Sequence, residues 1–156
     1  MKITILTICF LLLGKIAIAQ ELKYSEVPEA VKASFIDIYP EIKKVDWEKD
    51  GDNYEADFIY NNIVTSLVFD MTGKVVLRKE EIPVNTLPEN IKEYSSQNLN
   101  SDKLNKAVML TNEFGVIIFK VEINGTDYLF GVEGNFISRE SDYDYFEKYE
   151  DNEDGN

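Results

Sequence analysis

The chain has 156 residues, of which 29 are acidic and 16 basic, with no histidine and a single cysteine. Its net charge of −13 repels nucleic acids and anionic membrane surfaces, so neither is expected as a partner. Without histidine, and with its cysteine inside an N-terminal apolar run, the chain lacks the residues for Ser-His-Asp or Cys-His catalysis, the common zinc sites and c-type haem. We therefore expect no enzymatic activity, no cofactor and no metal ion.

The first 19 residues have the three parts of a secretory signal peptide. A lysine at the second position precedes an apolar run over residues 3–13, and Ala17-Ile18-Ala19 is a small-x-small cleavage site. The alternative is a membrane anchor, but the run ends at Gly14 and falls short of the roughly 20 residues that a spanning helix needs. We expect cleavage after Ala19, a mature chain that starts at Gln20, a periplasmic or secreted location, and no membrane insertion after cleavage.

The expected mature chain has no cysteine, so its stability must come from packing rather than from disulfides. Without Lys2 and Lys15 its net charge becomes −15, and residues 140–156 contain eight acidic residues and one lysine. We expect this acidic tail to be a solvated, flexible end, because its like charges repel one another. Its aromatic residues leave open a contact with a basic partner; they are Tyr143, Tyr145, Phe146 and Tyr149. Another alternative is that Tyr143, Phe146 and Tyr149, spaced at intervals of three, dock on the body as a third helix.

Two stretches of the mature chain are similar to each other, one over about 27–81 and the other over about 87–139. Val-Pro-Glu-Ala-Val-Lys, which starts at Val27, matches Leu-Pro-Glu-Asn-Ile-Lys, which starts at Leu87. The segment 69–78 matches the segment 130–139, with a glycine at the fifth position of each. Because the two matches lie at nearly equal offsets, chance similarity is a poor explanation. The sequence therefore predicts a tandem repeat.

Each repeat is expected to open with a helix, since Pro28 and Pro88 suit a first helical turn. In the first repeat an apolar stripe follows at helical spacing, formed by Val31, Phe35, Ile38 and Tyr39. The second repeat has a thinner stripe, formed by Ile91, Tyr94 and Leu99. We expect the second helix to be shorter or looser than the first.

Four strands are expected after each helix, because apolar and polar residues alternate there. They are predicted over 45–48, 54–60, 63–69 and 75–77 in the first repeat, and over 107–111, 116–123, 128–132 and 136–139 in the second. Turn residues separate them, as in Asp50-Gly51 and Asn124-Gly125. The predicted fold is α+β: a helix packed on a four-stranded antiparallel sheet, repeated, with a linker over 81–86.

These motifs resemble the β-lactamase-inhibitor-like, PepSY-like domain of exported Bacteroidota proteins. The resemblance rests on the Pro-Glu-x-Val-Lys helix start, Val-x-Trp47-Glu, the Asp50-Gly51 turn, the alternating strand over 54–60 and Phe69-x-x-x-Gly-Lys-Val. The resemblance implies the fold of a proteinaceous β-lactamase inhibitor but not inhibition itself. PepSY-type domains are regarded as inhibitory or regulatory modules of the envelope, and the family has no catalytic signature. The second repeat departs from the pattern, since Met109 lies near the position of the tryptophan.

The leading hypothesis is a non-enzymatic exported binding module, of which an inhibitor or regulator of an envelope or secreted protein is one form. It would present a solvent-facing sheet surface, or the groove between the repeats, to a protein partner. The candidate contact residues are Trp47, Tyr54, Tyr60 and Tyr128; for Trp47 the alternative is a core ring packed on the helix.

Two other functions remain open from the sequence. One is an acidic small-ligand or cation-binding periplasmic protein, and the other is a hydrolase that uses a pair of carboxylates. A pocket with converging carboxylates would favour these two, whereas a broad exposed patch without a pocket would favour protein binding.

Overall fold

The structure is a computed structural model and describes residues 20–101 and 103–139. The predicted signal peptide, its cleavage site and the acidic tail from residue 140 on lie outside the described residues. No helix in the described part of the chain is long and apolar enough to cross a bilayer.

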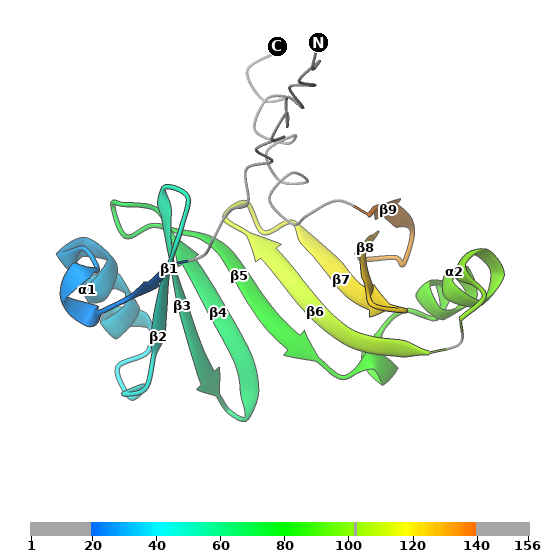
Figure 1. Cartoon of the computed structure of the whole chain (residues 1–156), viewed down its shortest axis with the longest axis horizontal. Coiled ribbons are helices and arrows are strands. Elements are labelled where there is room, and N and C mark those ends of the chain that lie inside the picture. The colour runs from blue at the N-terminus through cyan, green and yellow to red at the C-terminus, as the bar shows by residue number, and fades with distance from the viewer. Residues whose placement is uncertain (1–19, 102, 140–156) are drawn as a thin grey trace, which may run out of the picture.

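The described residues form an α+β fold with one antiparallel sheet of nine strands and two α-helices (Figure 1). The strands pair in chain order, each with the next. The elements are β1 (Gln20–Leu22), a 3-10 turn (Tyr24–Glu26), α1 (Glu29–Ile38), β2 (Asp46–Asp50), β3 (Asn53–Tyr60), β4 (Ile63–Phe69), β5 (Val75–Ile82), a second 3-10 turn (Val84–Thr86), α2 (Glu89–Leu99), β6 (Leu104–Asn112), β7 (Ile117–Ile123), β8 (Thr126–Gly131) and β9 (Phe136–Ser138).

The predicted α+β class is confirmed, but the sheet differs from the prediction. Each helix is followed by four strands, yet these do not form two separate sheets, because β5 pairs with β6 from Leu77 opposite Asn112 to Ile82 opposite Ala107. Residues 81 and 82, expected in a linker, belong to β5. A strand that the sequence analysis missed, β1, pairs with β2 at the edge of the sheet.

Helix α1 starts directly after Pro28 and ends before Pro40, as its sequence predicts. It buries Val31 and Phe35, and Tyr39 follows them into the core at the C-cap, whereas Ile38 is 44% exposed and lies outside the core. The predicted stripe is therefore correct in three of its four residues.

Helix α2 has 11 residues against 10 in α1, so it is not shorter; that it is looser stays a prediction. Its polar Ser95 is fully buried and its hydroxyl donates a hydrogen bond to the carbonyl oxygen of Ser101 at 2.5 Å. Ser95 interrupts the apolar stripe of α2, but this hydrogen bond satisfies its buried hydroxyl and joins the last turns of the helix to the segment that follows.

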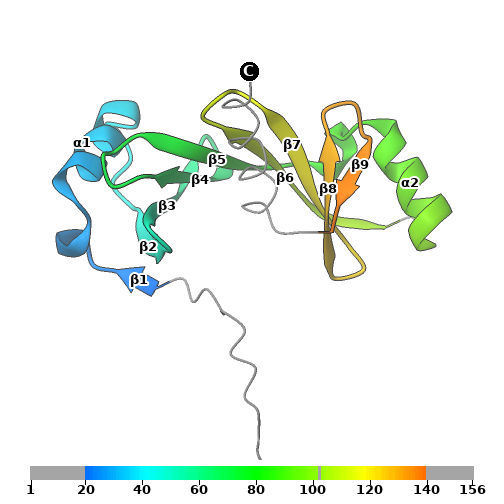
Figure 2. The same cartoon turned by 90° about the horizontal axis from the view of Figure 1, so that it is seen from above.

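Both helices pack on the same face of the sheet, one at each end (Figures 1 and 2). Residues opposite each other in a sheet share a face. Trp47, Ala56 and Leu67 lie in one such row beneath α1. The row continues to Arg78 on β5, and the alternation of β5 then places Ile82 on that face, opposite Ala107 beneath α2.

Two glycine turns touch the starts of the two helices. A Cβ atom on Gly73, in the turn between β4 and β5, would lie 2.6 Å from the carbonyl oxygen of Ala30 in α1. A Cβ atom on Gly134, in the turn between β8 and β9, would lie 2.9 Å from Cβ of Asn90 in α2. In each half, therefore, the Pro-Glu motif at the helix start lies against the glycine turn of the second matching motif.

Candidate interaction surfaces

The four aromatic residues predicted to bind a partner all lie on the helix-covered face. Trp47 and Tyr128 are 3% and 8% exposed and belong to the cores beneath α1 and α2. Tyr54 and Tyr60 are half-buried at the margin of the first core, where Lys49 Nζ lies 3.8 Å from the Tyr54 ring centroid. Their role in partner binding stays a prediction, and the burial of Trp47 favours its alternative role as a core ring.

An ion pair lies where the sequence predicts a groove between the two halves. On the helix-covered face between the two cores, Nη2 of Arg78 donates to Oε1 of Glu80 at 2.8 Å. Burial raises the pKa of the nearby Tyr39 hydroxyl above its ordinary value. Nε of Arg78 is buried without a hydrogen-bond partner among the described residues. Because the charge of Arg78 is paired with Glu80 within the fold, this ion pair offers little unpaired charge to a partner.

The opposite face of the sheet, called here the open face, contains five carboxylates at its N-terminal end. Glu21, Glu48 and Glu55 lie directly opposite one another on β1, β2 and β3. Asp46 lies opposite Asp57 in the next row of the same face. We call these five residues the acidic patch.

The acidic patch is only partly neutralised by its neighbours. Lys79 on β5 pairs with Glu55 at 2.9 Å, and the Ser66 hydroxyl donates a short hydrogen bond to Asp57. Burial, with a smaller effect of the surrounding carboxylates, raises the pKa of Glu48 above its ordinary value. Like charges directly opposite each other destabilise a sheet. The isolated protein therefore holds this patch at a cost in stability.

An exposed apolar pair extends the patch toward the tip of the hairpin formed by β3 and β4. Ile59 and Val64 lie opposite each other on the open face and are 65% and 48% exposed. Next to them a shallow cavity of about 280 Å³ lies between the hairpin and the end of β5. The acidic patch together with Ile59 and Val64 thus forms a surface with apolar and charged parts side by side.

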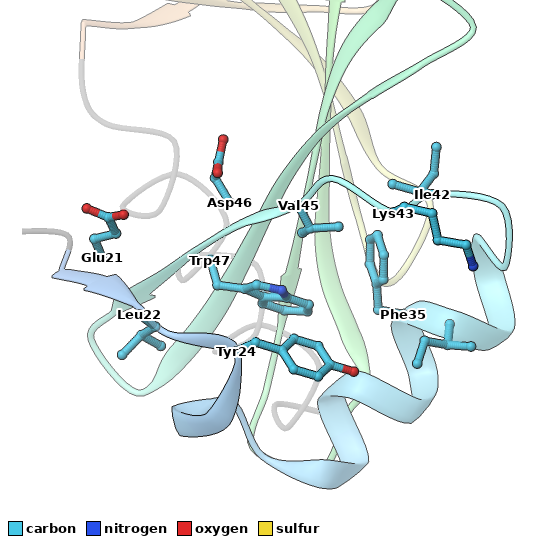
Figure 3. Close-up of a pocket in the computed structure, with 10 residues that line it drawn as sticks. Glu21, Leu22, Tyr24, Phe35, Ile42, Lys43, Val45, Asp46 and Trp47 are labelled. Atoms are coloured by element: carbon cyan, nitrogen blue, oxygen red, sulfur yellow. The ribbon is translucent and has the colours of Figure 1, made fainter.

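A separate pocket of about 540 Å³ lies between β1, α1 and the start of β2 (Figure 3). Its walls combine polar and apolar surface; the apolar and aromatic side chains include Leu22, Tyr24, Phe35, Val45 and Trp47. Figure 3 shows the carboxylates of Glu21 and Asp46 pointing away from the Trp47 ring, on the rim of the pocket. The pocket therefore lacks the converging carboxylates that would favour a hydrolase or a cation carrier.

The acidic patch was not predicted from the sequence, because in a chain with 29 acidic residues some carboxylates are expected to lie close together by chance. One signal was present, since the acids at 46 and 48 and at 55 and 57 alternate with apolar residues and so share one face of each strand. The register between the strands, which sets these residues side by side, cannot be deduced from that alternation. Within residues 20–101 and 103–139 no group of three or more acidic residues is placed to hold a metal ion.

Comparison with known proteins identifies the fold. No protein-family model and no curated protein matches the sequence. Three solved structures that resemble this chain come from Bacteroides species. One is a proposed periplasmic protein from Bacteroides eggerthii, with a TM-score of 0.61, 16% identity and coverage of 71% of this chain and 86% of that one.

The second is a DUF2874 family protein from Bacteroides uniformis, with a TM-score of 0.61, 22% identity and coverage of 70% and 86% of the two chains. The third is a BLIP-like protein, similar to a β-lactamase inhibitor protein, from Bacteroides fragilis, with a TM-score of 0.54, 22% identity and coverage of 70% and 83%. The resemblance found in the sequence is thereby confirmed at the level of the fold. This chain has the β-lactamase-inhibitor-like fold of these Bacteroides proteins.

Proposed function

We propose that this chain is a non-enzymatic exported binding module that holds a basic segment of a protein partner on its acidic patch. The observation that carries the proposal is the row formed by Glu21, Glu48 and Glu55 across three neighbouring strands. Among the described residues no lysine or arginine forms an ion pair with Glu21 or Glu48, so cationic side chains of a partner would relieve their repulsion. The exposed Ile59 and Val64 beside them offer apolar contact area, as protein interfaces require.

Inhibition or regulation of an envelope or secreted protein is the form of binding that we favour. The support is the fold shared with the BLIP-like structure, and fold alone does not define a target. A rigid antiparallel sheet presents its side chains without an ordering cost on binding, which suits an inhibitor.

Capture of the partner from an envelope extract tests the proposal. The mature chain, immobilised, is compared with the double variant Glu21→Gln/Glu48→Gln and with the matched control Glu89→Gln/Glu93→Gln, whose changes lie on α2. We expect a basic protein to be retained by the wild type and by the control, and to be lost from the patch variant and at high salt. Equal retention by all three proteins would show that the acidic patch is not the binding surface.

Export with cleavage after Ala19 is part of the same proposal. The first described strand starts at Gln20, directly at the expected new N-terminus, so cleavage there would leave the fold intact. Mass spectrometry of the native protein should find an N-terminus at Gln20 or its cyclised form. A mature protein that still contains Met1 would exclude export by this route.

We also infer that the two halves are copies of one helix-plus-four-strand unit. The support is the equal order of elements in α1 to β5 and α2 to β9, together with the contact of a glycine turn with the helix start in each half. If the inference is correct, Gly134→Ala should destabilise the protein as Gly73→Ala does.

Binding of a small ligand is the second candidate function, and the pocket beside Trp47 favours it. Because its walls combine apolar side chains with charged ones of both signs, we expect an amphipathic molecule rather than a cation. The lone tryptophan lines the pocket, so its fluorescence reports occupancy. Titration of the mature chain with a naphthalene sulfonate dye should change this fluorescence, and Ile36→Lys should abolish the change. An unaltered signal in the wild type would remove this candidate.

A further inference from the structure

The open face contains an apolar cluster that no described helix covers. Its five core residues are 0–3% exposed and all come from strands; they are Val68, Leu77, Leu110, Ile118 and Leu129. The other two clusters of the fold each contain residues of a helix. The open-face cluster therefore lacks the covering element that the helix-covered face has at both of its ends.

The chain leaves the described fold beside this cluster. Ser138, in the last strand, lies opposite Leu129, and Ile137 packs against the cluster. Residues 140–156 follow one residue after β9 and include four aromatic side chains. Seventeen residues reach at most roughly 55 Å when extended, whereas five strand spacings, the width from β9 to β4, amount to about 25 Å. The tail can therefore span the whole cluster.

The charge of the open face differs between its two halves. Lys79, Lys106 and Lys120 lie on β5, β6 and β7 around the cluster, together with Glu81, Glu122 and Asp127, and Lys106 pairs with Glu81 at 3.2 Å. The tail has a net charge of −7. The acidic patch lies on β1 to β3 and would repel the tail. Repulsion by the acidic patch therefore directs the tail to the β5–β9 half of the face, where positive and negative charges balance.

We propose that residues 140–156 bind intramolecularly to the open face, with their aromatic rings on the apolar cluster and their carboxylates near Lys106 and Lys120. This differs from the sequence-based expectation of a solvated tail, because the sequence alone does not show an apolar cluster without a described covering helix next to the start of the tail. The proposal does not require a partner. It leaves the acidic patch accessible and continues its negative surface across the sheet.

Amide hydrogen exchange on the intact mature chain tests the proposal. We expect residues 140–156 to exchange at least tenfold more slowly than the same segment as a free peptide. The triple variant Tyr143→Ser/Phe146→Ser/Tyr149→Ser and the variant Lys106→Gln/Lys120→Gln should each lose most of this protection. The matched control Lys23→Gln/Lys43→Gln, with its changes at the other end of the molecule, should keep it.

A second measurement separates the possible occupants. A chain shortened to end at Arg139 should bind a synthetic peptide of residues 140–156. Its affinity should be several-fold weaker at about 0.5 M than at about 0.05 M salt. The intact chain should not bind the peptide, because its own tail occupies the face. Exchange of residues 140–156 at free-peptide rates in the intact chain would overturn the proposal even if the shortened chain fails to fold. Protection that rises with protein concentration, together with a doubled mass in solution, would also overturn it, by showing that a second copy covers the face.

Discussion

Gly73 is the residue whose backbone most directly limits substitution. Its φ is +88°, and an added Cβ would lie 2.6 Å from the Ala30 carbonyl oxygen and 2.9 Å from its carbonyl carbon. We expect Gly73→Ala to lower the free energy of unfolding by more than about 2 kcal/mol, since backbone strain and overpacking both contribute.

The control for this change is Gly51→Ala. Gly51 also has a positive φ, +57°, but an added Cβ would meet no atom within 4 Å. Only the strain remains, so we expect a loss of about 1 kcal/mol. Denaturant unfolding of both variants measures the difference, and equal losses would show that the contact with α1 is unimportant.

Glu48 should make stability depend on pH in an unusual direction for a carboxylate. Its pKa is raised in the folded state, first by burial and then by Asp57, Glu55 and Glu21. The ionised form is therefore disfavoured by folding, and its cost is present at neutral pH and absent below the ordinary value of 4.5. We expect Glu48→Gln to stabilise the protein at pH 7 by about 0.5–1 kcal/mol.

This gain should disappear as the pH falls through the range above 4.5 in which Glu48 becomes protonated. Chemical unfolding of wild type and variant at several pH values checks it, with Glu93→Gln on α2 as the control for loss of one negative charge. A variant less stable than the wild type at pH 7 would show that the Glu48 carboxylate is favourably paired.

At the scale of elements, Phe35 is one of the buried side chains through which α1 packs on the sheet. Phe35 is 3% exposed, and its ring centroid lies 5.2 Å from that of Phe58 and 5.5 Å from that of Trp47. Phe35→Ala should cost roughly 3–5 kcal/mol, as large buried aromatics do. This is a large part of a typical stability of about 5–15 kcal/mol.

Ile38→Ala on the same helix is the matched control. Ile38 belongs to the stripe predicted from the sequence but is 44% exposed, so its loss should stay below about 1 kcal/mol. Denaturant unfolding of the two variants decides between the predicted and the observed stripe. Similar losses for both would mean that Ile38 is part of the core.

At the scale of the whole molecule, the continuous sheet should make the protein unfold in one step. β5 and β6 pair over six residues and join the strands that follow α1 to those that follow α2. Separation of the halves would break this pairing and expose the open-face cluster, whose residues come from both halves. We therefore expect one cooperative transition.

Fluorescence of Trp47, the lone tryptophan, reports the unfolding of the first half, and amide exchange of β7 and β8 reports the unfolding of the second. Both probes should give the same unfolding midpoint in denaturant. Two separate midpoints would show that the halves are independent folding units, and would contradict the stabilising role assigned to the β5–β6 pairing.

Much of the local structure follows from the sequence, because it depends on neighbouring residues. Proline and glycine positions and the two hydrophobic periods predicted both helices and eight of the nine strands, which the structure places within a few residues of their expected bounds. Composition and the matched motifs predicted the α+β class and the family resemblance. The missed strand, β1, has only three residues and is too short for its alternation to be informative.

Other features depended on contacts between residues far apart in the chain. Alternation shows which residues of a strand share a face, but not which of the two faces a helix will cover. For this reason the sequence offers Trp47 and Tyr128 as candidate contacts, whereas the structure buries both. The alignment of Glu21, Glu48 and Glu55 likewise depends on the pairing of β1, β2 and β3. Local sequence determined the elements of this protein, whereas long-range pairing decided which surface is exposed, because register and helix docking are set by the packing of the whole sheet.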